Sequence, residues 1–467
     1  MRLAERVLSP HGMPRSSLAA RALLAAHVSR EAFRAVKSGA ALGKTLRRVL
    51  GDALLLEITA RNFGTGSMIR GPHGLFPHIF MPDYHGPHFE EAVKRAVFPG
   101  RGPNIVYFSV TGVCPCHCEY CFAGAGGDER SDLGDEAVLR VARALAEQRI
   151  PLVNLSGGEP LSRFTRLVKV VRALSSGCEV RMFTTGIGLT RERLAELQGE
   201  GLKGLFVSLD GDDPARFDAV RGLPGSFDAA RAGLKLAASR DVLTFVNAVV
   251  GRQAFPTVRA VERYLRFVES IDPRIVVNFL PQLATGRGAD ADSFAAPADC
   301  EPVAERIVST ARRLGRPITM LFGRVDTFMG CVGAGGKLLN IDIAGNVTVC
   351  ISRAAVGNVL EEPFDQIYRR FRERCSRLKV GFFCCKVGEA GLGDVASLGG
   401  QEEDAEALGM FLNGRRLEVI ECGDHEVGVR RRDRAVCRLA NVECGPERHH
   451  VWCRRPSFMK SVHNARV

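Results

Sequence analysis

The feature that most constrains the fold is an alternation of short apolar, β-branched runs with amphipathic segments, beginning near residue 103. The segments between the runs, such as 134–148 and 164–174, repeat apolar residues every three or four positions, which predicts helices. Six runs have the composition of buried strands: NIVYFSVT (104–111), LVNLS (152–156), EVRMFTT (179–185), GLFVSLD (204–210), VLTFVNAVV (242–250) and RIVVNFLPQL (274–283). Alternating strands and helices form parallel sheets with right-handed crossovers. We therefore predict an α/β protein built on a partial (β/α)6 TIM-type barrel, with the active site at the carboxyl ends of the strands.

The rest of the chain divides into three further segments. Residues 1–50 carry ten Lys or Arg against two acidic residues, and 18–36 has helical apolar spacing with a basic face. We expect a basic helical N-terminal extension over 1–100 that packs on the main domain, contacts a membrane surface or binds a partner; a transit peptide is an alternative. We expect the barrel core over 101–290, a small cysteine-containing domain over 291–390, and a basic cysteine-containing tail of no assigned structure over 391–467.

Within the 291–390 segment, residues 299–314 and 363–378 have helical patterns. Residues 337–350 alternate in the manner of two strands around Ala344, Gly345 and Asn346, where Gly and Asn tolerate positive φ. The sequence therefore predicts a β-hairpin between two helices.

Composition excludes some classes of protein. No uninterrupted apolar run approaches the roughly 20 residues of a membrane-spanning helix, so we expect no transmembrane segment. Fifteen cysteines without a secretory signal pattern indicate a reducing, cytoplasmic compartment in which thiols bind metals. The net charge of +12 attracts nucleic acid, acidic substrates and anionic lipid alike. We expect no nucleic-acid partner, because no recognised RNA-binding module is present.

Three cysteines, Cys114, Cys118 and Cys121, follow the first predicted strand with three and two intervening residues. Three thiolates in one tight loop can bind three irons of a 4Fe-4S cluster and leave the fourth iron open to a ligand. A zinc site is the alternative, although zinc sites usually pair CxxC elements. Cys116 lies in the same loop, and we interpret it as a neighbour of the site.

This spacing, with the aromatic Tyr120 before the last cysteine, resembles the signature of the radical S-adenosylmethionine (radical SAM) superfamily. The resemblance implies a 4Fe-4S cluster on Cys114, Cys118 and Cys121 whose open iron chelates the amino and carboxylate groups of S-adenosylmethionine. An electron from the cluster then cleaves S-adenosylmethionine to a 5′-deoxyadenosyl radical, so these cysteines are the expected catalytic residues. Tyr120 matches a residue whose backbone lies near the adenine.

The stretch NLSGGEP (154–160), after the second predicted strand, is similar to the GGEP motif of that superfamily. The resemblance implies that the motif, Gly157, Gly158, Glu159 and Pro160, contacts the amino group of S-adenosylmethionine. Glycines also let a backbone approach a ligand closely. Pro160 would open the helix that follows.

The segment VSLDGDDPARFDAVRGLPGSF (207–227) resembles the branch of the superfamily that carries further clusters in a C-terminal domain. On that resemblance Ser208 and Asp210 contact the ribose region of S-adenosylmethionine, and Arg221 contacts its carboxylate. Thr184 and Thr185, which end the third predicted strand, are looser candidates for the same pocket. The structural alternatives are that Asp210 caps the next turn and that Arg221 pairs with Asp218.

The spacing of Cys331, Gly345 and Cys350 resembles the opening of a SPASM or shorter twitch domain, which binds auxiliary 4Fe-4S clusters. A later cysteine, Cys375, Cys384 or Cys385, could complete a site. The irregular spacing of the last four cysteines departs from the full SPASM pattern, so we expect one auxiliary cluster rather than two. The alternative is that these are ordinary reduced thiols.

The resemblance implies a radical SAM enzyme, and our leading hypothesis is a maturase that modifies a peptide or protein side chain. The alternatives are an enzyme of small-molecule, cofactor or lipid biosynthesis, and a nonenzymatic iron–sulfur electron-transfer protein. The expected partners are a peptide or small-molecule substrate and an electron donor such as flavodoxin or ferredoxin. The basic N-terminus is compatible with peripheral membrane contact.

Overall fold

The structure is a computed structural model. The described residues are 69–71, 74–76, 79, 81–83, 86–89, 91, 92, 95, 102–126, 132–240, 242–251, 254–282, 286–289, 297–316, 318–320, 338–349, 355–377, 411–412, 415–416, 419–421, 426–430 and 450–454. The basic segment expected over residues 1–50 lies outside them. Within this part of the chain, no helix has both the length and the apolar character needed to cross a membrane.

Ten strands form the main sheet, in the order β12-β11-β10-β3-β4-β5-β6-β7-β8-β9. All six predicted strands are confirmed, and they pair in parallel in chain order. They are β3 (Ile105–Ser109), β4 (Leu152–Ser156), β5 (Glu179–Thr184), β6 (Leu202–Ser208), β7 (Leu243–Val250) and β8 (Val276–Pro281). Their carboxyl ends therefore lie at one edge of the sheet, as a partial barrel requires.

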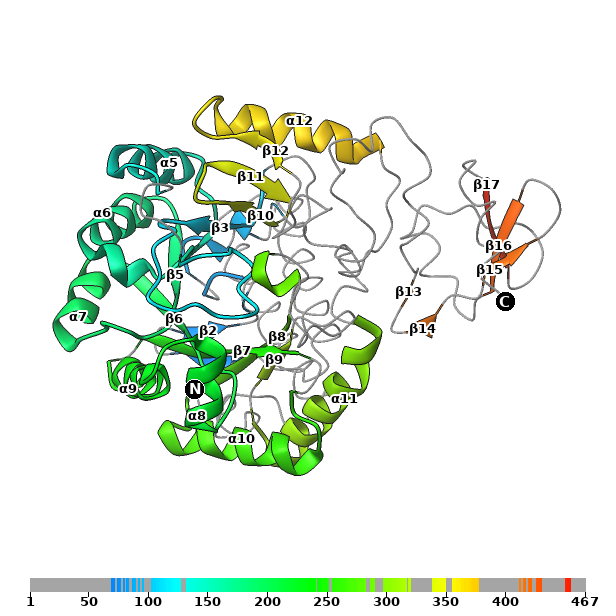
Figure 1. Cartoon of the computed structure of the whole chain (residues 1–467). Helices are drawn as coiled ribbons and strands as arrows, with labels where there is room; N and C mark the ends of the chain where they lie inside the picture. Colours follow the sequence, from blue (N-terminus) through cyan, green and yellow to red (C-terminus); the bar gives the residue numbers. More distant parts are fainter. Residues whose placement is uncertain are drawn as a thin grey trace, which may run out of the picture.

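Helices cover the outer face of this sheet (Figure 1). They are α5 (Asp135–Glu147), α6 (Phe164–Ser175), α7 (Arg191–Gly199), α9 (Ser226–Ala238), α10 (Val258–Ile271) and α11 (Pro297–Leu314), with a 3₁₀ turn, η2 (Pro160–Arg163), before α6. The short helix α8 (Pro214–Arg221) packs on α9. The alternation of side chains along each strand explains the layering. On β7, Val246, Ala248 and Val250 join the large core cluster shared with the helices, whereas Phe245 faces the barrel interior.

Three phenylalanines fill the barrel interior. The rings of Phe183 and Phe206 stack at a centroid distance of 4.4 Å, and those of Phe206 and Phe245 stack at 4.5 Å. Ile79, from the chain before the barrel, packs in the same cluster. The fully buried Arg181 donates hydrogen bonds to the carbonyls of Ile79 and Met81. Ile79 and Met81 therefore lie against the barrel interior.

Further strands extend both edges of the sheet. Strand β9 (Ile318–Met320) pairs with β8. The predicted hairpin is confirmed as β10 (Leu338–Ile341) and β11 (Asn346–Val349), with Gly345 at a φ of 83°. Strand β10 runs parallel to β3, so the hairpin continues the barrel sheet, and β12 (Ala355–Asn358) and α12 (Phe364–Arg377) follow it.

The structure also has short strands outside the main sheet. Before the barrel, β1 (Ile69–Gly71) pairs with β2 (Gly74–Phe76). Beyond residue 390, where the sequence led us to assign no structure, there are five: β13 (Phe411–Leu412), β14 (Arg415–Arg416), β15 (Val419–Glu421), β16 (Glu426–Arg430) and β17 (His450–Arg454). The alternation in EVGVR and HVWCR is the strand signal that we overlooked.

We predict that Phe206→Ala lowers the free energy of unfolding by about 3–5 kcal/mol, because it removes the middle ring of the stack and leaves a cavity. Denaturant unfolding followed by circular dichroism would measure the change. Val258→Ala is the matched control, since Val258 is 49% exposed and its truncation should change stability by no more than about 0.5 kcal/mol. Equal effects of the two substitutions would contradict the interior position of Phe206.

Candidate functional site

The cysteine loop, residues 110–126, leaves the carboxyl end of β3 and contains Cys114, Cys118 and Cys121. Cys118 is buried, whereas Cys114 and Cys121 are partly exposed. The loop has no helix or strand of its own. Its shape therefore depends on contacts with the segments that end the neighbouring strands.

The first of these contacts is with the GGEP segment, at the end of β4. The amide of Gly158 donates to the carbonyl of Thr111 at 2.6 Å, and the amide of Glu159 donates to the carbonyl of Val113 at 2.8 Å. Gly157 has a φ of 125°, and a Cβ on it would lie 2.3 Å from the Thr111 carbonyl oxygen. A Cβ on Gly158 would lie 2.2 Å from that of Val113. The two glycines are therefore required by the cysteine loop itself.

Two segments later in the chain form hydrogen bonds with the middle of the cysteine loop. At the end of α8, the carbonyl of Arg221 accepts from the amide of His117 at 2.9 Å. After β8, in the 3₁₀ turn η3 (Gly286–Ala289), Arg287 donates from its amide to the Cys121 carbonyl and from Nε to the Cys118 carbonyl. A Cβ on Gly286 would lie 2.3 Å from the Cys121 carbonyl oxygen. The backbone between the second and third cysteines is thus held from two directions.

The thiols of the cysteine loop shift one another's pKa values. Cys116 is buried and hydrogen-bonds to both Cys114 and Cys118, which raises its own pKa. The hydrogen bond between Cys116 and Cys114 lowers the pKa of Cys114. For Cys118, the bond from Cys116, together with the positive charge of Arg221, lowers the pKa to about 6 despite burial. Cys118 is therefore a thiolate at neutral pH, which is the form that binds iron.

Among the described residues, no group of three His, Cys, Asp or Glu side chains is arranged to hold one metal ion. An iron–sulfur cluster has a different requirement, because each thiolate binds a different iron atom. The donor set in the loop therefore fits a cluster better than a single ion such as zinc.

Arg221 links the cysteine loop to the end of β6. Its guanidinium pairs with Asp210 at 2.5 Å and lies 3.8 Å from Sγ of Cys118. Tyr120 donates a hydrogen bond to the same carboxylate, whose second oxygen accepts from the amide of Val249 at 2.9 Å. Burial opposes the charge on Arg221, but Asp210, Tyr120 and Cys118 outweigh it and raise its pKa. These residues form one charged network beside Cys118.

Both structural alternatives for this segment are wrong. Asp218 accepts hydrogen bonds from the amides of Gly225 and Phe227 and from the hydroxyl of Ser226, so it anchors the start of α9 and is not the partner of Arg221. Asp213, not Asp210, caps α8. This leaves Arg221 and Asp210 paired with each other at the strand ends.

Glu159 is buried, and hydrogen bonds surround its carboxylate. It accepts from the hydroxyl of Thr184 at 2.8 Å, from the amide and hydroxyl of Thr185 at 2.6 Å each, and from the amide of Leu161. Burial raises the pKa of Glu159, although these bonds oppose that effect. Glu159 and Thr184 therefore connect the ends of β4 and β5, and Pro160 begins η2.

Sequence reasoning missed a row of polar side chains on the inner face of β7, β8 and β9. Thr319 donates to Asn278, and Asn278 donates to Asn247, each at 2.8 Å. Asn247 lies opposite Ser208 in the strand register. The signal was available, because an asparagine inside an apolar strand run is a buried polar group that needs a partner.

The structure thus brings the cysteine triad, Tyr120, the GGEP residues, Thr184, Ser208, Asp210 and Arg221 to the carboxyl ends of β3 to β6. The predicted auxiliary ligands are not tested. Cys331, Cys350, Cys384 and the side chain of Cys375 lie outside the described residues. The auxiliary cluster stays a prediction.

A partial parallel barrel with a three-cysteine loop at its carboxyl end defines a class of iron–sulfur enzymes, and comparison with known proteins agrees. Residues 108–255 match the Radical SAM superfamily. An AdoMet-dependent heme synthase from Methanosarcina barkeri is 25% identical over 57% of this chain and 82% of that protein. A PqqA peptide cyclase from Rhizobium meliloti is 25% identical over 63% of this chain and 85% of that protein.

Among solved structures, SuiB of Streptococcus suis bound to S-adenosylmethionine aligns with a TM-score of 0.49 and 14% identity, over 62% of this chain and 72% of that one. The family match and the two curated relatives carry the assignment. Residues 108–255 are therefore a radical SAM domain, and the enzymes of that superfamily use a 4Fe-4S cluster and S-adenosylmethionine.

We predict that Gly158→Ala sharply reduces iron and sulfide incorporation during anaerobic reconstitution, because the new Cβ would collide with the Val113 carbonyl and displace the cysteine loop. Colorimetric iron and sulfide analysis would measure the loss. Gly199→Ala is the control, since a Cβ there meets nothing within 4 Å. Full incorporation by both variants would refute the close approach.

We also predict a pH effect in the cluster-free protein. Alkylation of Cys118 should be half-maximal near pH 6. In Cys116→Ala the midpoint should move up by at least about one pH unit, because the strongest influence lowering the pKa of Cys118 is lost. Mass spectrometry of the alkylated peptides would measure the extent of Cys118 alkylation at each pH. Cys178 is the internal control: burial raises its pKa to about 12, so it should stay unreactive through pH 9.

Proposed function

We propose that this radical SAM enzyme cleaves S-adenosylmethionine reductively at Cys114, Cys118 and Cys121 and uses the radical to modify a peptide or protein side chain. The observation that supports the first part is the cysteine loop, clamped at the carboxyl ends of the strands with two partly exposed thiols. Cys114, Cys118 and Cys121 would hold a 4Fe-4S cluster, which would supply the electron for reductive cleavage of S-adenosylmethionine.

The remaining residues bind and orient S-adenosylmethionine in this proposal. Arg221 is the cation for its carboxylate, since guanidinium groups pair well with carboxylates. Within the described chain, Nε of Arg221 has no hydrogen-bond partner, which fits a role in binding an additional acceptor. Both carboxylate oxygens of Asp210 already accept hydrogen bonds, so Ser208 is the freer group for a ribose hydroxyl.

The backbone beside the cluster completes the expected pocket. Gly157 and Gly158 are partly exposed, whereas the Glu159 side chain is fully engaged with Thr184, Thr185 and Leu161. In our proposal the GGEP segment therefore contacts the amino group of S-adenosylmethionine through its backbone. The backbone of Tyr120 lies near the adenine.

A peptide substrate is favoured by the similarity to a PqqA peptide cyclase, which extends over 85% of that protein. An electron donor such as flavodoxin or ferredoxin would reduce the cluster. The second candidate is small-molecule or cofactor biosynthesis, which the similarity to an AdoMet-dependent heme synthase favours.

We predict that the anaerobically reconstituted full chain, reduced with dithionite, converts S-adenosylmethionine to 5′-deoxyadenosine. Replacing Cys114, Cys118 and Cys121 together by Ala should reduce this to the background rate, because the ligands of the cluster are lost. Liquid chromatography with mass spectrometry would quantify the product. Cys178→Ala, which changes a buried thiol outside the loop, should retain activity.

Absence of 5′-deoxyadenosine from an iron-replete protein would refute the proposal. The substrate class needs a separate assay, in which the enzyme is incubated with short peptides encoded beside its gene and with small-molecule extracts. A mass change in a peptide that depends on S-adenosylmethionine would support the maturase. A mass change confined to a small molecule would replace it with the second candidate.

A further inference from the structure

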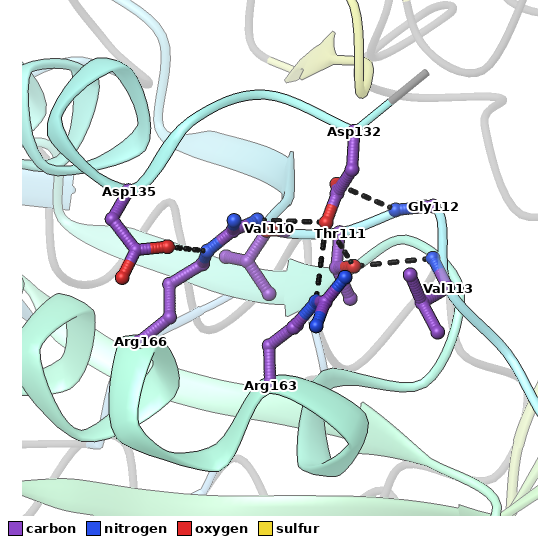
Figure 2. Close-up of polar contacts among 8 residues, drawn as sticks. All are labelled: Val110, Thr111, Gly112, Val113, Asp132, Asp135, Arg163 and Arg166. Carbon is purple, nitrogen blue, oxygen red and sulfur yellow. Dashed lines mark hydrogen bonds and ion pairs between the residues drawn. The ribbon is translucent and has the colours of Figure 1, made fainter. Parts of the chain in front are cut away.

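One carboxylate, that of Asp132, hydrogen-bonds to Thr111 and Gly112 and so joins the two ends of the segment that carries the cysteines (Figure 2). We call this junction of Thr111, Gly112 and Asp132 the neck of the loop. Asp132, just before α5, accepts a hydrogen bond from the hydroxyl of Thr111 at 2.8 Å and another from the amide of Gly112 at 3.0 Å. Gly112 and Asp132 lie 20 positions apart in the chain. Cys114, Cys116, Cys118 and Cys121 all lie between them.

The same carboxylate is held in place by the segment that follows the GGEP motif. Arg166, on α6, donates to Asp132 at 3.0 Å and to the carbonyl of Val110 at 3.0 Å. Arg163, on η2, forms an ion pair with Asp132 at 3.6 Å. The side chains of Asp132 and Arg166 are only 5% and 8% exposed. The side chain of Asp132 is therefore a buried, charge-compensated acceptor.

Residues 111–113 are thereby held on two sides. On one side, the carbonyls of Thr111 and Val113 accept the amides of Gly158 and Glu159. On the other side, the hydroxyl of Thr111 and the amide of Gly112 donate to Asp132. The Thr111 hydroxyl also accepts from the amide of Val113 at 3.1 Å, so the chain is fixed directly before Cys114.

We propose that Asp132 is a positioning residue that closes the neck of the cysteine loop and pre-organises its thiolates before a cluster is bound. This inference rests on the proposed function, because it gives the loop a role in cluster binding. Joining the two ends of a flexible loop has an entropic cost, and a closure made in advance removes that cost from the binding step. Hydrogen bonds to a carboxylate are stronger than neutral ones, and burial protects them from solvent.

Asp135 offers a matched comparison. It is the first residue of α5 and pairs with Nε of the same Arg166 at 2.7 Å. Its side chain is 54% exposed, and its ion-pair partner is Arg166, which lies outside the cysteine loop. Asp135→Asn therefore removes an acidic partner of Arg166 without touching the neck.

The first test measures hydrogen exchange in the cluster-free full chain. In Asp132→Asn, amides of residues 111–126 should exchange at least about tenfold faster than in the unsubstituted protein, because an amide nitrogen now replaces one acceptor oxygen. Asp135→Asn should leave them unchanged. Exchange in β5 to β7 serves as the measure of global folding and should not change in either variant.

Thr111 provides a second pair of variants that keeps the Asp132–Arg166 ion pair. Thr111→Val removes the hydroxyl bond to Asp132 and should accelerate exchange in the loop, whereas Thr111→Ser retains the hydroxyl and should restore protection. After reconstitution, the variants with faster exchange should also lose iron to a chelator about tenfold faster. The visible absorbance of the cluster would follow that loss.

Two results would overturn the proposal. One is exchange in residues 111–126 that is the same in Asp132→Asn as in the unsubstituted protein. The other is an equal acceleration in β5 to β7, which would mean that Asp132 stabilises the whole domain. If Asp132→Asn does not fold, Thr111→Val and Thr111→Ser decide between these outcomes. Because exchange is read without S-adenosylmethionine, its result is separate from any failure of the proposed enzymatic activity.

Discussion

The candidate site depends on one steric constraint, the absence of side chains at Gly157 and Gly158. Adjacent parallel strands bring their following loops together, and here the backbone after β4 pairs with the backbone after β3 through the amides of Gly158 and Glu159. Any Cβ at either glycine would lie within about 2.3 Å of a carbonyl oxygen of the cysteine loop. The cysteines occupy their positions because a second, unrelated stretch of chain leaves room for them.

Buried ion pairs also hold the cysteine loop in place. Arg221 compensates Asp210 and lies beside Cys118, whose pKa is lowered to about 6. At the neck, Arg166 compensates Asp132 in the same way. Both cations are buried, and a buried cation is tolerated only where acceptors and anions surround it. The ion pair of Arg166 and Asp132 therefore lies beside the start of the cysteine loop, and the ion pair of Arg221 and Asp210 lies beside its middle.

Periodicity alone was sufficient for the barrel, because alternating strands and amphipathic helices allow few arrangements. It also placed the cysteine triad, the GGEP segment and the Ser208–Asp210 segment at one edge of the sheet. Periodicity could not reveal which residues contact the cysteine loop. Asp132, Gly286 and Arg287 carry no local signal, since their roles arise from contacts with the cysteine loop across long stretches of chain. The sequence offered Asp218 as an ion-pair partner of Arg221, but the turn after α8 engages Asp218 with the start of α9, and Arg221 pairs with Asp210.

The contact between Arg287 and Cys118 joins residues 169 positions apart in the chain. Because a protein is synthesised from its N-terminus, the cysteines leave the ribosome long before η3 and the strand that precedes it exist. During that interval the loop lacks the contacts on its second half, and its thiols are open to oxidation or to stray metals. The contacts of Arg287 with the second half of the loop can therefore form only after the sixth parallel strand, β8, has been synthesised.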